Sequence, residues 1–334
     1  MAGGPERETD ENGFKARAGA LTLLYLASPI ERSFLLTMLA EAATGVELID
    51  DSDLPDPDEP IDLEILADPY LVEPTDPDFE PSDEIDWDTE LRATPAGEEL
   101  LVVAPVLERW LNDCPLGRVT LGPDAGPPLS ALLGGWCSTT MHALAAGPLT
   151  VAEAVEAIGT LGDEVVEERL EDMVEVGQLE LLRGEDGEER FAVTDWLRMA
   201  IAPLAIAARM EHRHPPGDTA PIAALDVEAA FLLTLPLLEL PPDLSGTCSL
   251  AVELDEDVVP NPAGVTVQVE AGRIAYVEAG LDEDADSWAS APAPDLLDTL
   301  IEPETKRVST GGGRLSRRLL DELHTVLFGA STVP

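Results

Sequence analysis

The most regular pattern of hydrophobic and polar positions runs from residue 134 to residue 196. Three segments repeat apolar residues at the three- and four-residue spacing of an amphipathic helix, and two shorter segments are typical of strands. In the third helical segment Val166, Leu170 and Met173 share one face. We therefore expect helices over residues 136–145, 150–158 and 163–176, followed by strands over residues 179–182 and 190–194.

The residues between these segments carry the signals of helix ends and a tight turn. A Gly-Pro pair at residues 147–148 ends the first helix, because proline cannot continue the hydrogen-bond ladder. Thr150 and Glu153 have the spacing of a capping box, and Gly177 stops the third helix. A polar tip at residues 184–187 joins the two strands. This order predicts a winged helix-turn-helix, with the third helix in the place of the recognition helix.

The motifs GGWCSTTMHALAAGPLT (residues 134–150) and TDWLRMAIAPL (residues 194–204), taken with the wing between them, resemble the HxlR-type winged-helix transcriptional regulators. A longer resemblance is to a subgroup that carries one winged domain before this one and a sterol-carrier-protein-like domain after it. The resemblance implies an α+β chain of two winged helix-turn-helix domains and a small sterol-carrier-like domain. The corresponding segments are a disordered lead at 1–12, a degenerate first winged domain at 13–112, a second, HxlR-like winged domain at 127–214 and the α+β domain at 218–330.

The first winged domain departs from the family where its reading helix should lie. No Lys or Arg occurs between Arg32 and Arg92, and residues 46–90 form an insert rich in Asp, Glu and Pro. Prolines interrupt helices and like charges repel, so we expect this acidic insert to be mostly irregular and exposed. Around it we expect helices over 16–27, from residue 28 and over 61–67, strands over 70–72 and 85–93, and a helix capped by Thr94 that runs to about residue 111.

The C-terminal pattern changes to short strands between apolar helices. The turn at residues 270–273 joins two of the strands. By resemblance, a sheet and helices of this kind can enclose an apolar ligand, whereas the plainer interpretation is a packed core without a cavity. The expected elements are helices over 227–238, 295–301 and 315–328 and strands over 248–254, 265–269 and 274–279.

Two helices have apolar faces at domain ends, over residues 100–111 and 194–213. By resemblance, helices of this kind pair regulators into dimers, so we expect a symmetric homodimer. For the helix over 194–213 the alternative is that it packs within its own domain.

Charge argues against strong nucleic-acid binding. The chain has 67 acidic and 19 basic residues, a formal net charge of −48, and such a surface repels phosphate backbones. A salt-adapted surface would give the same composition. The DNA-binding candidates are the basic residues of the second winged domain, Arg169, Arg183 and Arg190. The place of the recognition helix instead presents an acidic face made of Asp163, Glu164, Glu167, Glu168, Glu171 and Asp172.

No motif points to catalysis, a metal or a cofactor. The sequence lacks GxSxG, GxxxxGK and HExxH, its three cysteines have no metal-ligand spacing, and His212 and His214 have no further ligand nearby. Three glycines at 311–313 precede a helix with Arg314, Arg317 and Arg318, where an anion could bind, although such arginines also pair with neighbouring carboxylates. We expect a non-enzymatic protein.

The leading interpretation is a cytoplasmic, dimeric winged-helix transcriptional regulator with weak DNA contacts and a C-terminal domain for ligand sensing or assembly. No apolar run is long enough for a membrane span, and the N-terminus is too polar for a signal peptide. One alternative is an acidic protein-interaction or DNA-mimicking module that binds a basic protein. A second alternative is a carrier of an apolar ligand.

Overall fold

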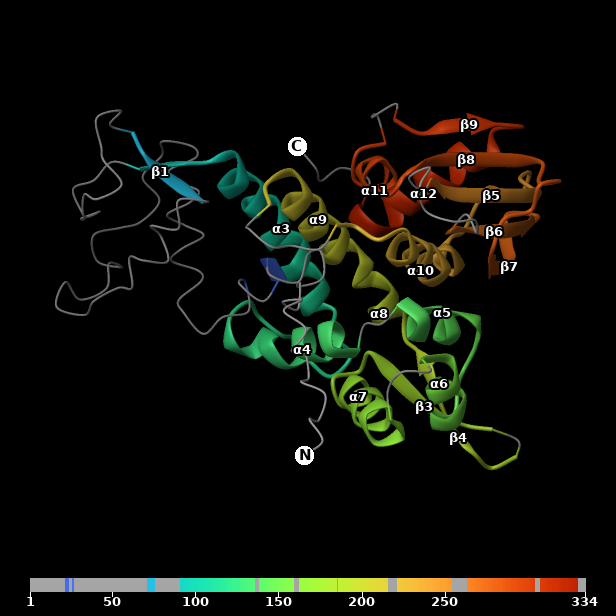
Figure 1. The fold of residues 1–334 in the computed structure, drawn as a ribbon, viewed down its shortest axis with the longest axis horizontal. Helices are drawn as coiled ribbons and strands as arrows, with labels where there is room; N and C mark the ends of the chain where they lie inside the picture. The colour runs from blue at the N-terminus through green and yellow to red at the C-terminus, as the bar shows by residue number, and fades with distance from the viewer. Residues whose placement is uncertain are drawn as a thin grey trace, which may run out of the picture.

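The structure is a computed structural model that describes Thr22, Leu23, Leu26 and residues 71–75, 91–135, 138–158, 162–184, 186–215, 221–253, 263–303 and 307–329. Helices and strands mix along these residues, which confirms the α+β class (Figure 1). The lead at 1–12, the helix expected from residue 28, the helix expected over 61–67 and most of the acidic insert lie outside the described residues. Of the helix expected over 16–27, the three described positions are helical.

A short antiparallel ladder precedes the first long helix. Strand β1 (Val72–Pro74) pairs with β2 (Leu91–Ala93), so the first strand lies two residues later than the 70–72 expected. Helix α3 (Pro95–Asn112) then starts as predicted, because the Thr94 hydroxyl accepts a hydrogen bond from the Gly97 amide at 3.2 Å.

The elements expected between residues 134 and 194 are present in the predicted order. The capping box of α6 is formed: the Thr150 amide donates to the Glu153 carboxylate at 2.8 Å, and the Glu153 amide donates to the Thr150 hydroxyl at 3.2 Å. We call α5 to β4 the second winged unit. Its elements, with the preceding helix, are α4 (Gly126–Gly135), α5 (Ser138–Ala146), α6 (Val151–Ile158), α7 (Asp163–Glu175), β3 (Leu179–Arg183) and β4 (Glu189–Val193).

The single helix expected over 194–213 is wrong, since the segment forms two helices. Helix α8 (Asp195–Met199) begins at the Thr194 cap, and α9 (Ile201–Arg213) follows after Ala200. The break has a local cause in Pro203, which has no amide hydrogen to donate to the Met199 carbonyl and whose ring crowds that carbonyl.

A five-stranded sheet forms the C-terminal part of the fold. Its order is β7-β6-β5-β8-β9, with β5 and β8 parallel and the other neighbours antiparallel. At the predicted β6–β7 turn Ala271 and Gly272 both have positive φ, at 50° and 79°, as a two-residue hairpin of this hand requires. The strands are β5 (Gly246–Glu253), β6 (Ala263–Glu270), β7 (Arg273–Ala279), β8 (Ser287–Pro292) and β9 (Ser309–Gly311).

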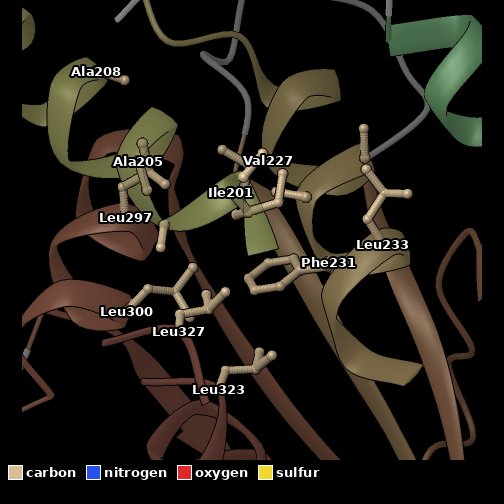
Figure 2. Packing of buried hydrophobic residues seen from close by; sticks show 14 of the residues in the cluster. Ile201, Ala205, Ala208, Val227, Phe231, Leu233, Leu297, Leu300, Leu323 and Leu327 are labelled. Atoms are coloured by element: carbon tan, nitrogen blue, oxygen red, sulfur yellow. The ribbon is translucent and has the colours of Figure 1, made fainter. Parts of the chain in front are cut away.

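Three helices pack on the sheet and form its core (Figure 2). They are α10 (Ala224–Thr234), α11 (Ala293–Ile301) and α12 (Leu315–Phe328), the last with the predicted bounds. The helix expected over 227–238 begins three residues earlier and ends at Thr234, because Pro236 follows it and the chain tightens into the 3-10 turn η2 (Leu235–Leu237). Phe231 and Leu323, both fully buried, face one another across this core in Figure 2.

Helix α9 joins the two ends of the described chain. It packs against α3 on one side and against α11 and α12 on the other (Figure 1). The Arg109 guanidinium on α3 donates to the carbonyl of Phe328 at 3.0 Å, and the Thr22 amide donates to the buried Glu211 carboxylate at 2.8 Å. The buried apolar residues thus form one continuous cluster across the predicted domain boundaries, which remain predictions.

Polar contacts join α3 to α8, and α5 of the second winged unit to α10. Trp110 of α3 and Trp196 of α8 stack with ring centroids 4.5 Å apart, and each indole N–H donates to the other residue's carbonyl, at 2.8 and 2.7 Å. Glu228 of α10 accepts the Gly264 amide and lies 3.2 Å from Nδ1 of His142 on α5.

Candidate interaction surface of the second winged unit

Helix α7 is held by a narrow apolar stripe and leaves most of its surface to solvent. Val166, Leu170 and Met173 are buried, as predicted, against the neighbouring helices and β3. The helix ends at Val176, and Gly177 takes a φ of 82°. There the Gln178 amide donates to the Met173 carbonyl at 2.8 Å and the Gly177 amide to the Val174 carbonyl at 3.0 Å, a Schellman end. Helix α7 therefore has a buried face and a well-defined C-terminal end.

The remaining surface of α7 is an acidic patch. All six carboxylates predicted for this surface are exposed, and none of them makes an ion pair with a described residue. Unpaired like charges on successive turns repel one another and favour a cationic partner. We call this set the α7 face: Asp163, Glu164, Glu167, Glu168, Glu171 and Asp172.

Arg190, one of the three DNA-binding candidates, is already paired within the chain. Its guanidinium lies 3.0 Å from the Asp186 carboxylate, 3.3 Å from Glu153 and 4.0 Å from Glu188. The hydrogen bond to Asp186 and the charge of Glu153 raise the pKa of Arg190. A phosphate would have to displace these carboxylates, so Arg190 is poorly placed as a DNA contact.

The other two candidates lie apart from Arg190 along the chain and on different elements. Arg169 is half-buried on α7 and forms no ion pair with a described residue, and Arg183 is exposed at the end of β3, where its Nε donates weakly to the Gly187 carbonyl at 3.5 Å. The three arginines come from α7, β3 and β4, and they are outnumbered by the six carboxylates of the α7 face. The described part of this unit is therefore acidic overall.

Exposed apolar side chains on α7 and β3 were not predicted from the sequence. Val165 of α7 is 40% exposed, and Leu181 and Leu182 of β3 are 49% and 40% exposed. Strand β4 pairs with β3 on one edge and with Leu149 on the other, whereas β3 pairs only with β4 among the described residues. The sequence LELLR carries a signal for this feature, because consecutive leucines in a short strand must place one on each side.

The two helices expected to form a dimer cover each other's apolar faces instead. Along α3, Leu100, Leu107 and Trp110 are buried, and Ile201 and Ile206 of α9 are buried with them. These faces are used within one chain, but α3 and α9 come from different predicted domains, so the packing also differs from the alternative of a helix kept within its own domain. The homodimer stays a prediction.

The described residues were also expected to hold no metal site and no membrane-spanning helix. Within the described ranges no group of three or more His, Cys, Asp or Glu side chains is arranged to hold a metal ion. His212 is exposed, and His214 lies 3.7 Å from the Glu99 carboxylate. None of the helices in these ranges combines the length and apolarity needed to cross a bilayer.

Comparison with known proteins leaves the chain without an assigned family. No protein-family model, no curated protein and no solved structure matches it.

Proposed function

We propose that this chain is an acidic interaction module that binds a basic protein surface through its second winged unit. The observation that carries the proposal is the α7 face, six exposed carboxylates without an ion-pair partner among the described residues. Complementary charge steers encounter and selects partners, so a face of this kind suits an arginine- or lysine-rich surface. The exposed Val165, Leu181 and Leu182 add apolar contact area of the kind that protein interfaces bury.

The electrostatics near the wing support the same proposal. Arg190 is neutralised by Glu153 and Asp186 rather than held free for phosphate. Hydrogen bonds from Thr150 lower the pKa of Glu153, and the Glu188 amide lowers that of Asp186, so both carboxylates stay charged at neutral pH. The carboxylates around Arg190 thus keep their negative charge at neutral pH.

The second candidate function is the winged-helix transcriptional regulator expected from the resemblance. The helix order α5, α6, α7 followed by the β3–β4 hairpin favours it, and Arg169 and Arg183 are its remaining basic contacts. DNA affinity through only two phosphate contacts would be weak and would have a shallow salt dependence. The apolar-ligand carrier is less favoured, because the side chains that would line a ligand site on the sheet pack against one another (Figure 2).

The test compares two variants that change net charge equally. The face variant replaces Glu167, Glu168, Glu171 and Asp172 with the corresponding amides. The control variant does the same to four exposed carboxylates on β6, on β7 and in the segment after β7, namely Glu270, Glu278, Glu283 and Asp284. Binding to a labelled arginine-rich peptide and to labelled duplex DNA is measured by anisotropy across a salt series.

The face variant should lose about tenfold in peptide affinity, since each exposed charge pair contributes about a factor of two. The control variant should lose much less. Equal losses in both variants would show a response to net charge alone and would refute a specific face. If DNA binds the wild-type chain and Arg169→Gln with Arg183→Gln removes that binding, the regulator function holds instead.

A further inference from the structure

An arginine-lined pocket lies at the start of α12, in the part of the chain that forms the five-stranded sheet. Its volume is about 330 Å³, at the small end of the range of ligand sites. It is lined by Arg314, Arg317 and Arg318 at the start of α12 and by Asp243 and Leu244, which precede β5. Three of the chain's 19 basic residues therefore line one small cavity.

Two of the three arginines have partners, as expected from the sequence, and the third does not. The Arg314 guanidinium lies 2.8 Å from the Asp243 carboxylate, and Arg318 lies 2.5 Å from Glu322. Arg317 is exposed and makes no ion pair with a described residue. Arg314 and Arg318 are thus paired with carboxylates, whereas Arg317 has no ion pair with a described residue.

The position of these arginines conflicts with the local electrostatics of the helix. Arg314 is the N-cap of α12 and Arg317 lies in its first turn, where no acidic residue occurs. The N-terminal end of a helix carries partial positive charge and normally attracts acidic side chains, which this chain has in excess. Departures from such sequence preferences occur most often at functional sites. A bound anion would offset the repulsion between these arginines and the N-terminal end of α12.

We propose that this pocket binds a small oxyanion, a phosphate or carboxylate group carried by a compound small enough for the cavity. Arg317 supplies the planar pair of donors that such groups accept, and Arg314 also lines the pocket. Asp321 also lines the pocket and repels a second anionic group, so the ligand carries one such group and a neutral remainder against Leu244 and Pro241. This site is independent of the protein-binding function proposed above.

The experiment measures thermal unfolding of the full chain with inorganic phosphate or acetate, with sodium chloride keeping the ionic strength constant. A ligand that binds only the folded state raises the midpoint in a saturable way. The two anions separate a phosphate from a carboxylate ligand. The test variant is Arg317→Gln, and the control is Arg118→Gln, an exposed arginine whose Nε donates to Asn112.

One of the two anions should raise the midpoint saturably, and Arg317→Gln should weaken that binding by about tenfold or more, the effect of losing a charge-assisted hydrogen bond. Without ligand the variant should unfold like the wild type, because Arg317 has no ion pair to lose. The control should bind normally. Midpoints that follow ionic strength alone, or equal affinity of Arg317→Gln and the wild type, would overturn the proposal.

Discussion

The stacked tryptophans should make a measurable contribution to stability. Trp110 and Trp196 are both nearly fully buried, at 3% and 6% exposure, and exchange two hydrogen bonds. Replacing either with Phe keeps an aromatic ring and removes one N–H donor from a buried carbonyl, which costs about 1–3 kcal/mol. The weaker stacking of a phenyl ring adds about 0.5–1.5 kcal/mol to this loss of stability.

The matched control is Trp288→Phe. Trp288 on β8 is 43% exposed, so its replacement should lower the free energy of unfolding by less than about 1 kcal/mol. Urea unfolding followed by circular dichroism gives the free energy of each variant. The Trp110→Phe, Trp196→Phe double variant should cost less than the sum of the single variants, because the two residues form one stack. If either single change costs no more than Trp288→Phe, the pair does not hold α3 to α8 as inferred.

Four further predictions concern single residues. Burial raises the pKa of the Cys248 thiol to about 12, so almost no thiolate exists near neutral pH, and Cys248 should resist alkylation until the chain unfolds; labelling of the native protein followed by peptide mass analysis checks this. Thr150→Ala should lower the free energy of unfolding by about 1 kcal/mol through loss of the cap, measured in urea, and an unchanged midpoint would contradict it. The pKa of Glu153 is lowered in the folded state, so its ionised carboxylate stabilises the fold above pH 4.5, the ordinary pKa of a glutamate, and this stabilisation is lost as the pH falls through the folded pKa. The free energies of unfolding of Glu153→Gln and of the wild type, measured against pH, should therefore converge in acid. Gly272→Ala should cost about 2 kcal/mol or more, because φ is 79° and the new Cβ would lie 2.3 Å from the Leu240 carbonyl oxygen; calorimetry tests it, with Gly187→Ala as an uncrowded positive-φ control.

Local features of the fold were predictable from sequence. The caps at Thr94 and Thr150 and the stop at Gly177 depend on residues within a few positions, so their side chains alone determine them. The break before α9 was missed although Pro203 was visible, because the apolar pattern continues through it. The order of the sheet and the packing of α3 on α9 depend on contacts between distant segments, which periodicity does not encode.

The candidate surface was predicted in part. Helical spacing correctly placed the carboxylates of the α7 face on exposed positions, because the buried stripe leaves them no other side. The pairing of Arg190 with Glu153 joins residues 37 positions apart and could not be inferred from either segment alone. The exposure of Leu181 and Leu182 depends on what covers the wing, which is a tertiary property.

The closure of the chain around α9 has a consequence for synthesis. The hydrogen bond from Arg109 to Phe328 spans 219 residues, and the one from Thr22 to Glu211 spans 189. During translation α3 and α9 leave the ribosome long before α11 and α12, so one side of α9 stays uncovered until the last helices emerge. Contacts between such distant segments slow folding. The apolar surface of α9 that α11 and α12 later cover is exposed until then, and exposed apolar surface is what chaperones bind.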